Sequence, residues 1–189
     1  MRIITGSARG CKLKVPKGMA TRPTADRIKE SLFNILGTTV RDARVLDLFA
    51  GTGSLGLEAL SRGAAAAVFI DQRTARLIAE NAGHAHLVGR AEILAGDAFR
   101  QMERLAAARR QFDLVFCDPP YARGLWQRAL ALLDSAALLA PDALVVVESG
   151  RGEPDVPPMG HLPLVREQSY GAATQIRIYK YRESTGGTA

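Results

Sequence analysis

The stretch Asp47-Leu48-Phe49-Ala50-Gly51-Thr52-Gly53-Ser54-Leu55-Gly56 decides the fold, because it reads as a buried strand, a glycine-rich turn and the start of a helix. Gly51, Gly53 and Gly56 fit the spacing G-x-G-x-x-G, in which glycines let the backbone approach a ligand closely. Asp71 lies twenty residues beyond Gly51, at the end of the next predicted strand, where a carboxylate can accept hydrogen bonds from ribose hydroxyls. The pattern predicts a nucleotide-containing cofactor on a Rossmann-like sheet.

Predicted strands and helices alternate on both sides of this turn, which indicates βαβ units and a parallel sheet covered by helices on both faces. Two final β runs have no helix between them and predict an antiparallel hairpin at one edge of the sheet. The predicted strands are 45–49, 66–70, 92–94, 112–117, 144–148, 162–169 and 174–181, and the predicted helices are 55–60, 73–82, 99–109 and 125–133.

The first 36 residues follow a different pattern. Two short β runs, 2–5 and 12–15, are separated by turn residues and predict a small hairpin. Pro23 and Thr24 then open a helix, with Thr24 as its expected cap. An apolar stripe of helical period runs along it at Ile28, Leu32, Ile35 and Leu36.

Length and composition restrict the class of protein. The 189 residues suit one domain with a small appendage, and 47% hydrophobic residues exclude a disordered or fibrous chain. Cys11 and Cys117 are far apart and match no zinc or disulfide spacing, which indicates a reducing compartment. With no signal peptide or membrane-spanning run, we expect a cytoplasmic monomer without membrane contact. We expect an extension over 1–37, a main domain over 38–182 and a disordered tail over 183–189.

The net charge of +6 is concentrated at the N-terminus. Residues 1–30 hold eight basic and two acidic residues, whereas the rest of the chain is balanced. Such an arm predicts a polyanionic partner, although a solvated surface segment has the same pattern. The basic residues are Arg2, Arg9, Lys12, Lys14, Lys17, Arg22, Arg27 and Lys29, of which Arg9, Lys12, Lys14 and Lys17 are the candidate contacts to RNA.

Asp47 helps to separate two possible cofactors. A carboxylate four residues before Gly51 repels the pyrophosphate of NAD and attracts the ammonium of a methionine moiety, which favours S-adenosylmethionine. Alternatively, Asp47 caps the loop and the glycines form only a tight turn. Asp97 follows the third strand and either faces the adenine or caps the next helix. The candidate cofactor residues are Asp47, Phe49, Gly51, Gly53, Asp71, Asp97 and Ala98.

The candidate catalytic turn is Asp118-Pro119-Pro120-Tyr121, which directly follows the predicted strand 112–117. Two prolines hold the chain rigidly extended, so that a carboxylate, a carbonyl and an aromatic ring are fixed at the end of the strand. Asp118 and the Pro119 carbonyl can bind the two N–H groups of an amine on a nucleobase, while Tyr121 stacks on the base. Rate enhancement then comes from orientation and electrostatics without a covalent intermediate.

Other reactive side chains have simpler interpretations. Cys117 lies in an apolar strand and is expected in the core rather than as a nucleophile. His84 and His86 are two residues apart, do not share a helix face and lack an acidic partner, so we expect no metal.

Three blocks together resemble the bacterial RsmD family, which methylates N2 of a guanine in small-subunit ribosomal RNA. These blocks are Arg22–Asn34, Leu46–Gly53 and Asp118–Tyr121, and the similarity covers almost the whole chain. The resemblance implies a seven-stranded class I methyltransferase fold, S-adenosylmethionine, and an assembled ribosomal particle as substrate with the basic arm on RNA. It also implies that the cofactor and target pocket is bordered by Arg22, Thr24, Asp26 and Arg27.

Three other functions remain open from the sequence. A DNA base methyltransferase can use the same Asp118–Tyr121 turn, but it usually has a separate target-recognition domain for which 189 residues leave no room. A non-enzymatic RNA-binding protein would bind no cofactor, and an NAD oxidoreductase would need a hydride-transfer acid or base that the sequence does not show.

Overall fold

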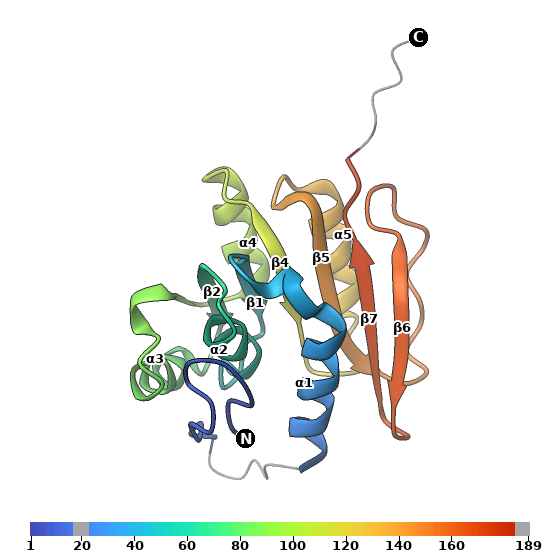
Figure 1. Ribbon diagram of the computed structural model, residues 1–189. Helices are drawn as coiled ribbons and strands as arrows, with labels where there is room; N and C mark the ends of the chain where they lie inside the picture. Colours follow the sequence, from blue (N-terminus) through green and yellow to red (C-terminus); the bar gives the residue numbers. More distant parts are fainter. Residues whose placement is uncertain (17–22, 184–189) are drawn as a thin grey trace. The chain divides into compact units, whose positions relative to one another are not determined.

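The computed structural model describes residues 1–16 and 23–183, and the side chains of 23–25 are outside that description (Figure 1). Two predicted RNA contacts, Lys17 and Arg22, the side chain of Thr24 and most of the predicted tail therefore lie outside the described residues. The chain forms two compact units, Met1–Gln101 and Met102–Ala189. The predicted extension, residues 1–37, lies within the first of these units.

The first unit contains three parallel strands in the order β3-β2-β1. Leu46 pairs with Val68 and Asp71 pairs with Ala95, so the carboxyl ends of β1 and β2 lie on the same edge. The strands and helices are α1 (Pro23–Leu36), β1 (Arg44–Leu48), α2 (Ser54–Ser61), β2 (Ala66–Asp71), α3 (Ala75–His84), β3 (Ala91–Ala95) and α4 (Ala98–Ala107), with 3₁₀ turns at Gly37–Val40 and Val88–Arg90.

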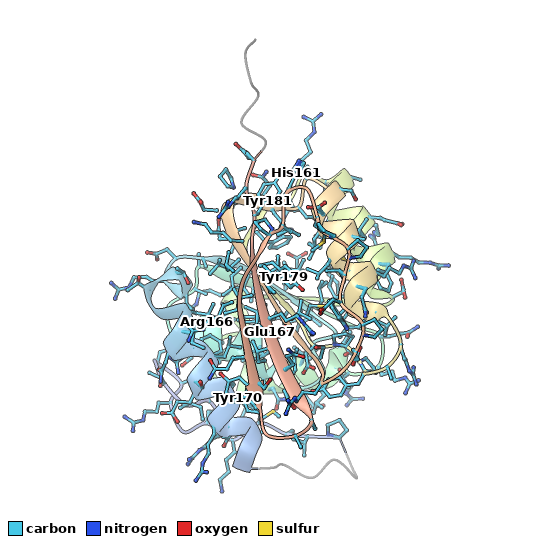
Figure 2. All side chains as sticks on the ribbon, turned by 90° about the vertical axis from the view of Figure 1, so that its right-hand side faces the viewer. His161, Arg166, Glu167, Tyr170, Tyr179 and Tyr181 are labelled. Atoms are coloured by element: carbon cyan, nitrogen blue, oxygen red, sulfur yellow. The ribbon has the colours of Figure 1, made fainter. Side chains whose placement is uncertain are left out.

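The second unit joins a parallel pair of strands to an antiparallel hairpin. Strands β4 and β5 are parallel, β5 and β7 are antiparallel, and β6 pairs with β7 as the outer strand, which Figure 2 shows with Arg166, Glu167 and Tyr170 labelled. The elements are β4 (Phe112–Cys117), α5 (Leu125–Ser135), β5 (Leu139–Gly150), β6 (Leu164–Tyr170) and β7 (Thr174–Lys180).

The predicted α/β fold is confirmed as a seven-stranded mixed sheet with a C-terminal antiparallel hairpin. Each predicted strand and helix of the main domain is present, with shifts of a few residues at the ends. Strand β5 is longer than the predicted 144–148, because Leu139 already pairs with Phe112 of β4 across an irregularity in the register. Among the described residues, no helix combines the length and apolarity needed to cross a bilayer.

The predicted N-terminal hairpin forms around an antiparallel bridge between Arg2 and Lys12, and backbone hydrogen bonds join residues 1–3 to residues 10–13. A side chain of α2 attaches this hairpin to the rest of the first unit. Glu58 of α2 accepts hydrogen bonds from the backbone N–H groups of Ile4 and Thr5, at 2.7 and 3.0 Å. The arm is therefore attached to α2 through a fully buried carboxylate.

Helix α1 begins at Pro23, so the predicted capping role of Thr24 is wrong, since Thr24 is already inside the helix. Proline suits the first helical position because its missing N–H has no partner there. Within the predicted apolar stripe, Leu32 and Leu36 are buried while Ile28 is half-buried.

Candidate active site

The glycine-rich turn after β1 is an irregular loop with three left-handed residues. Phe49, Gly51 and Gly53 have φ values of 58°, 56° and 76°. Glycine adopts such angles without steric cost, and Gly53 occupies the position directly before α2. Its N–H donates to the Ala50 carbonyl at 2.7 Å, which closes the turn. The turn thus delivers the chain from the end of β1 to the N-terminus of α2.

Asp47 is buried below this turn, with 1% of its surface exposed. Its Oδ2 accepts a hydrogen bond of 2.9 Å from the N–H of Gly56, in the first turn of α2. Burial raises the pKa of Asp47 to about 8, the bond from Gly56 partly offsets this, and the charge of Asp71 adds to it. No donor among the described residues binds Oδ1, so this acceptor remains available to a cation. Asp47 therefore caps the turn, as the alternative interpretation held, and retains one oxygen for a ligand.

Gly56 brings α2 close to β2. A Cβ atom at this position would lie 2.3 Å from Cε1 of Phe69 and 3.0 Å from Oδ2 of Asp47. Any side chain would therefore push the helix away from the strand, and with it the N–H that binds Asp47.

Asp71 holds the turn from the end of β2. Its Oδ2 accepts from the N–H of Gly51 at 3.0 Å, and its Oδ1 accepts from Arg73 and Thr74 at 2.7 and 2.9 Å. Burial raises the pKa of Asp71, but these hydrogen bonds outweigh it and hold the pKa below its usual value. Asp71 is thus an ionised carboxylate beside the turn, as a ribose ligand would require.

Asp97 caps helix α4. Its Oδ1 accepts from the N–H of Arg100 at 3.1 Å, three residues later, which is the usual bond of an N-cap. The side chain is exposed, and Ala98 behind it is buried. The rings of Phe49 and Phe99 meet edge to face, with centroids 6.0 Å apart. Phe49 therefore lies beside the start of α4. Asp97 has the capping role that the sequence allowed, and this role does not prevent the predicted contact to adenine.

In the second unit, the turn Asp118–Tyr121 leaves the carboxyl end of β4. Asp118 and Pro120 are exposed and Pro119 is buried, so the two prolines face opposite environments. The Tyr121 hydroxyl donates to Oε1 of Glu148 at 2.8 Å. Burial raises the pKa of Tyr121, and the charges of Glu148 and Asp118 raise it further, so the hydroxyl stays neutral. Asp118, Tyr121 and Glu148 thus form one electrostatic cluster.

Glu153 holds the chain on the far side of this turn. Its carboxylate accepts from the N–H groups of Ala122 and Gly150 at 3.2 and 2.9 Å and from Nε1 of Trp126 at 2.8 Å. Burial raises the pKa of Glu153, but these bonds and Arg177 hold it below its usual value. The turn and the end of β5 are therefore fixed by one carboxylate.

Arg177 of β7 supports the same region from a buried position. Its guanidinium lies 4.9 Å from the ring centroid of Trp126 and binds Glu167 at 2.9 Å and Asp155 at 3.0 Å. Figure 2 shows Glu167 on the outer strand of this hairpin. Sequence patterns do not indicate Glu148, Glu153 or Arg177, because the contacts that join them to the turn and to Trp126 come from residues far away along the chain.

The predicted RNA contacts in the first unit differ in their availability. Arg9, Lys12 and Arg27 are exposed, whereas Lys14 pairs with Glu80 at 3.0 Å. Arg9 also lines a hollow of about 420 Å³ with His84 and His86. The charge available to a partner is thus smaller than the sequence count.

Two charged residues of α1, Asp26 and Lys29, make contacts within the first unit. Asp26 pairs with Arg2 at 3.5 Å. Lys29 is buried and donates to the Arg2 carbonyl at 2.6 Å and to Oγ of Ser54 at 3.1 Å. Burial lowers the pKa of Lys29, although the nearby Glu58 raises it. Lys29 therefore links the arm to α2.

Asn81 of α3 is a site residue that sequence reasoning missed. It is fully buried, and its Oδ1 accepts from the N–H of Lys14 at 2.8 Å. Its Nδ2 donates to the carbonyls of Lys14 and Thr52 at 3.1 and 2.9 Å. Because Thr52 belongs to the glycine-rich turn, one amide connects the basic arm to the candidate cofactor site.

Comparisons with known proteins agree with these observations. An RNA methyltransferase from Salinibacter ruber, solved with S-adenosyl-L-homocysteine, superposes with a TM-score of 0.62 over 87% of this chain and 95% of its own, at 18% identity, which shows a shared fold. The solved structure of yhhF from Escherichia coli is 39% identical, with a TM-score of 0.81 over 96% of this chain and 98% of that chain. The fold is therefore that of the class I S-adenosylmethionine-dependent methyltransferases.

The family follows from the sequence matches. The family described as Conserved hypothetical protein 95 matches residues 1–180. Ribosomal RNA small subunit methyltransferase D of Escherichia coli (strain K12) is 41% identical over 98% of this chain and 92% of that protein. The chain belongs to this family, and the resemblance to the RsmD family is confirmed.

Proposed function

We propose that this protein transfers a methyl group from S-adenosylmethionine to the exocyclic N2 amine of a guanine in small-subunit ribosomal RNA. The name of its Escherichia coli relative supports ribosomal RNA as the substrate class. The observation that carries the choice of an amine is the rigid turn Asp118–Tyr121, which presents hydrogen-bond acceptors beside an aromatic ring.

The residues of the first unit suit the cofactor. Asp47 is a buried carboxyl with a raised pKa and a free oxygen, so a bound ammonium would stabilise its ionised form. Asp71 offers an ionised carboxylate for ribose hydroxyls, and Gly51 and Gly53 keep the turn free of side chains. Asp97 and Ala98 are proposed to border the adenine. When bound, S-adenosylmethionine supplies an electrophilic methyl group on a sulfonium.

The turn Asp118–Tyr121 is proposed to prepare the amine. The lone pair of an exocyclic nitrogen is delocalised into the base, which makes it a poor nucleophile. Acceptors at Asp118 and the Pro119 carbonyl would bind its two N–H groups and favour a pyramidal nitrogen with an available lone pair. A nitrogen–carbon bond forms, the sulfur–carbon bond breaks, and the nitrogen releases a proton to water. Tyr121 stacks on the base and orients it.

The exposed basic residues of the arm are proposed to hold RNA. Arg9, Lys12 and Arg27 present cations to the solvent and fit contacts to phosphates. An assembled small subunit is the proposed substrate, because the arm is small and a preformed particle would provide the remaining orientation. We further propose that Arg22, Thr24, Asp26 and Arg27 border the cofactor and target pocket, as the family resemblance implies, and that Lys17 contacts RNA.

A transfer assay tests this proposal. The purified protein is incubated with S-adenosylmethionine labelled in its methyl group and with small ribosomal subunits, free small-subunit RNA or duplex DNA. We expect label in the RNA of the small subunits and none in DNA. Label in DNA alone would favour a DNA base methyltransferase, and no transfer together with no cofactor binding would favour a non-enzymatic RNA-binding protein.

A further inference from the structure

Glu148 lies beside the candidate catalytic turn, but the proposed reaction uses only Asp118, Pro119 and Tyr121. Strands β4 and β5 are in parallel register with Cys117 opposite Val147. Asp118 is the first residue after β4, and Glu148 is the next residue along β5, so the two carboxyl groups lie at the same edge of the parallel pair. The Tyr121 hydroxyl donates to Oε1 of Glu148 at 2.8 Å, which brings this carboxyl group to the stacking ring.

The ring of Tyr121 is held from two directions. Its hydroxyl lies 2.8 Å from Glu148 and 3.4 Å from Oγ1 of Thr174. Its body lies against Gly150, where a Cβ atom would approach Cδ2 of the ring to 3.4 Å. Tyr121 is nevertheless 39% exposed as a residue. A supported ring with an open surface is suited to stacking on an extruded base.

The second oxygen of Glu148 remains available. No donor among the described residues binds Oε2, and the side chain is half-buried rather than enclosed. Tyr121 therefore fixes one oxygen of the carboxyl group and leaves the other at the edge of the stacking ring. A polar group of a stacked base is the natural partner for such an acceptor.

The chemistry of the base edge makes this acceptor selective. Guanine has an N1–H donor directly beside its N2 amine, whereas adenine has an unprotonated N1 beside its N6 amine and cytosine an unprotonated N3 beside its N4 amine. A carboxylate oxygen accepts from N1–H of guanine and repels the lone pairs of the other two bases. We propose that Glu148 is a specificity-determining residue, which holds Tyr121 with Oε1 and selects guanine by accepting its N1–H with Oε2. This inference rests on the proposed function.

A matched pair of bases tests the inference. 2-Aminopurine keeps the N2 amine but has an unprotonated N1. Small subunits are reconstituted with RNA that carries either guanine or 2-aminopurine at the modified nucleotide, and kcat/KM for methyl transfer is measured for both. We expect the unsubstituted enzyme to prefer guanine by about tenfold or more, the scale of a hydrogen bond to a charged group.

Glu148→Gln should remove this preference. The amide oxygen of glutamine can still accept from the Tyr121 hydroxyl, and this orientation turns the NH₂ group toward the base. There the NH₂ group clashes with N1–H of guanine but can donate to the unprotonated N1 of 2-aminopurine. We expect the ratio of the two kcat/KM values to fall to within about threefold of unity, or to reverse, a loss of most of the hydrogen-bond discrimination. The affinity for S-adenosylmethionine should be unchanged and reports correct folding.

Asp142→Asn is the matched control, because Asp142 is an exposed β5 carboxylate that pairs with Lys180, and asparagine accepts its φ of 61°. This variant should keep the preference for guanine. If Glu148→Gln lowers kcat/KM for both bases equally, Glu148 has only a structural role and the inference is wrong. If the unsubstituted enzyme transfers no methyl group to the guanine substrate, the proposed function itself fails.

Discussion

Gly56→Ala provides a quantitative test of how the cofactor turn is built. Within a helix, replacing glycine with alanine ordinarily stabilises a protein by up to about 1 kcal/mol. Gly56 lies in α2, so propensity alone predicts a gain. The structure predicts the opposite sign, because the new Cβ would lie 2.3 Å from Cε1 of Phe69 and 2.8 Å from its Cζ.

The size of the effect follows from two costs. Overpacking of a close-packed interior typically costs about 1–3 kcal/mol. The same Cβ would lie 3.0 Å from Oδ2 of Asp47 and would disturb the 2.9 Å bond from the Gly56 N–H, which adds about 1 kcal/mol. After subtraction of the propensity gain, we expect Gly56→Ala to lower the free energy of unfolding by about 1–3 kcal/mol.

Urea denaturation without cofactor measures this difference, and Gly83→Ala is the control. Gly83 also lies in a helix, α3, and a Cβ there would meet no atom within 4 Å. The control should be neutral or stabilised by up to about 1 kcal/mol. At about 2–4 °C per kcal/mol, the two variants should also differ visibly in Tm. Equal stability of the two variants would refute the proposed close packing at Gly56.

Three further predictions concern the cofactor, the amine and the RNA. The pKa of Asp47 is about 8 in the folded protein, against an ordinary value of 3.8, so the folded state keeps a proton that the unfolded state loses. The free energy of unfolding without cofactor should therefore fall as pH rises toward 8, and Asp47→Asn should weaken this dependence. The same variant should reduce the affinity for S-adenosylmethionine in calorimetry. A retained affinity would contradict the ammonium contact. Asp118→Asn should keep measurable turnover while Asp118→Ala loses about 10²-fold, since an amide oxygen can replace the carboxylate as an acceptor, and equal inactivity would reject this role. Replacing Arg9 and Lys12 with alanine should reduce the slope of RNA affinity against salt by about 1 for each lost phosphate contact, without changing cofactor affinity; an unchanged slope would place the RNA elsewhere.

The glycine-rich turn of the candidate cofactor site was largely predictable from sequence, because its contacts are local or follow from strand order. Gly51 and Gly53 stand where left-handed backbone is needed, and Asp71 ends β2 beside them, as the spacing indicated. The capping role of Asp97 could also be predicted, because an N-cap bond spans only three residues.

Contacts between distant parts of the chain could not be predicted in this way. Asn81 binds Lys14 across 67 residues, and Glu58 binds Ile4 across 54, so nothing in the local pattern indicates either pair. These bonds attach the N-terminal hairpin to α2 and α3. Lys29 was counted as available charge from composition, yet it is buried and binds the Arg2 carbonyl. Glu148, the second carboxyl group at the candidate catalytic turn, was not predictable for the same reason.

The identity of the methylated nucleoside tests the central claim most directly. Small ribosomal subunits treated with the protein and S-adenosylmethionine are digested to nucleosides and analysed by mass spectrometry, with fragmentation to place the added methyl group. We predict N2-methylguanosine as the new product, and its loss when the Asp118→Ala variant is used. Methylation of a ring carbon, of a ribose or of an amine on another base would contradict the account.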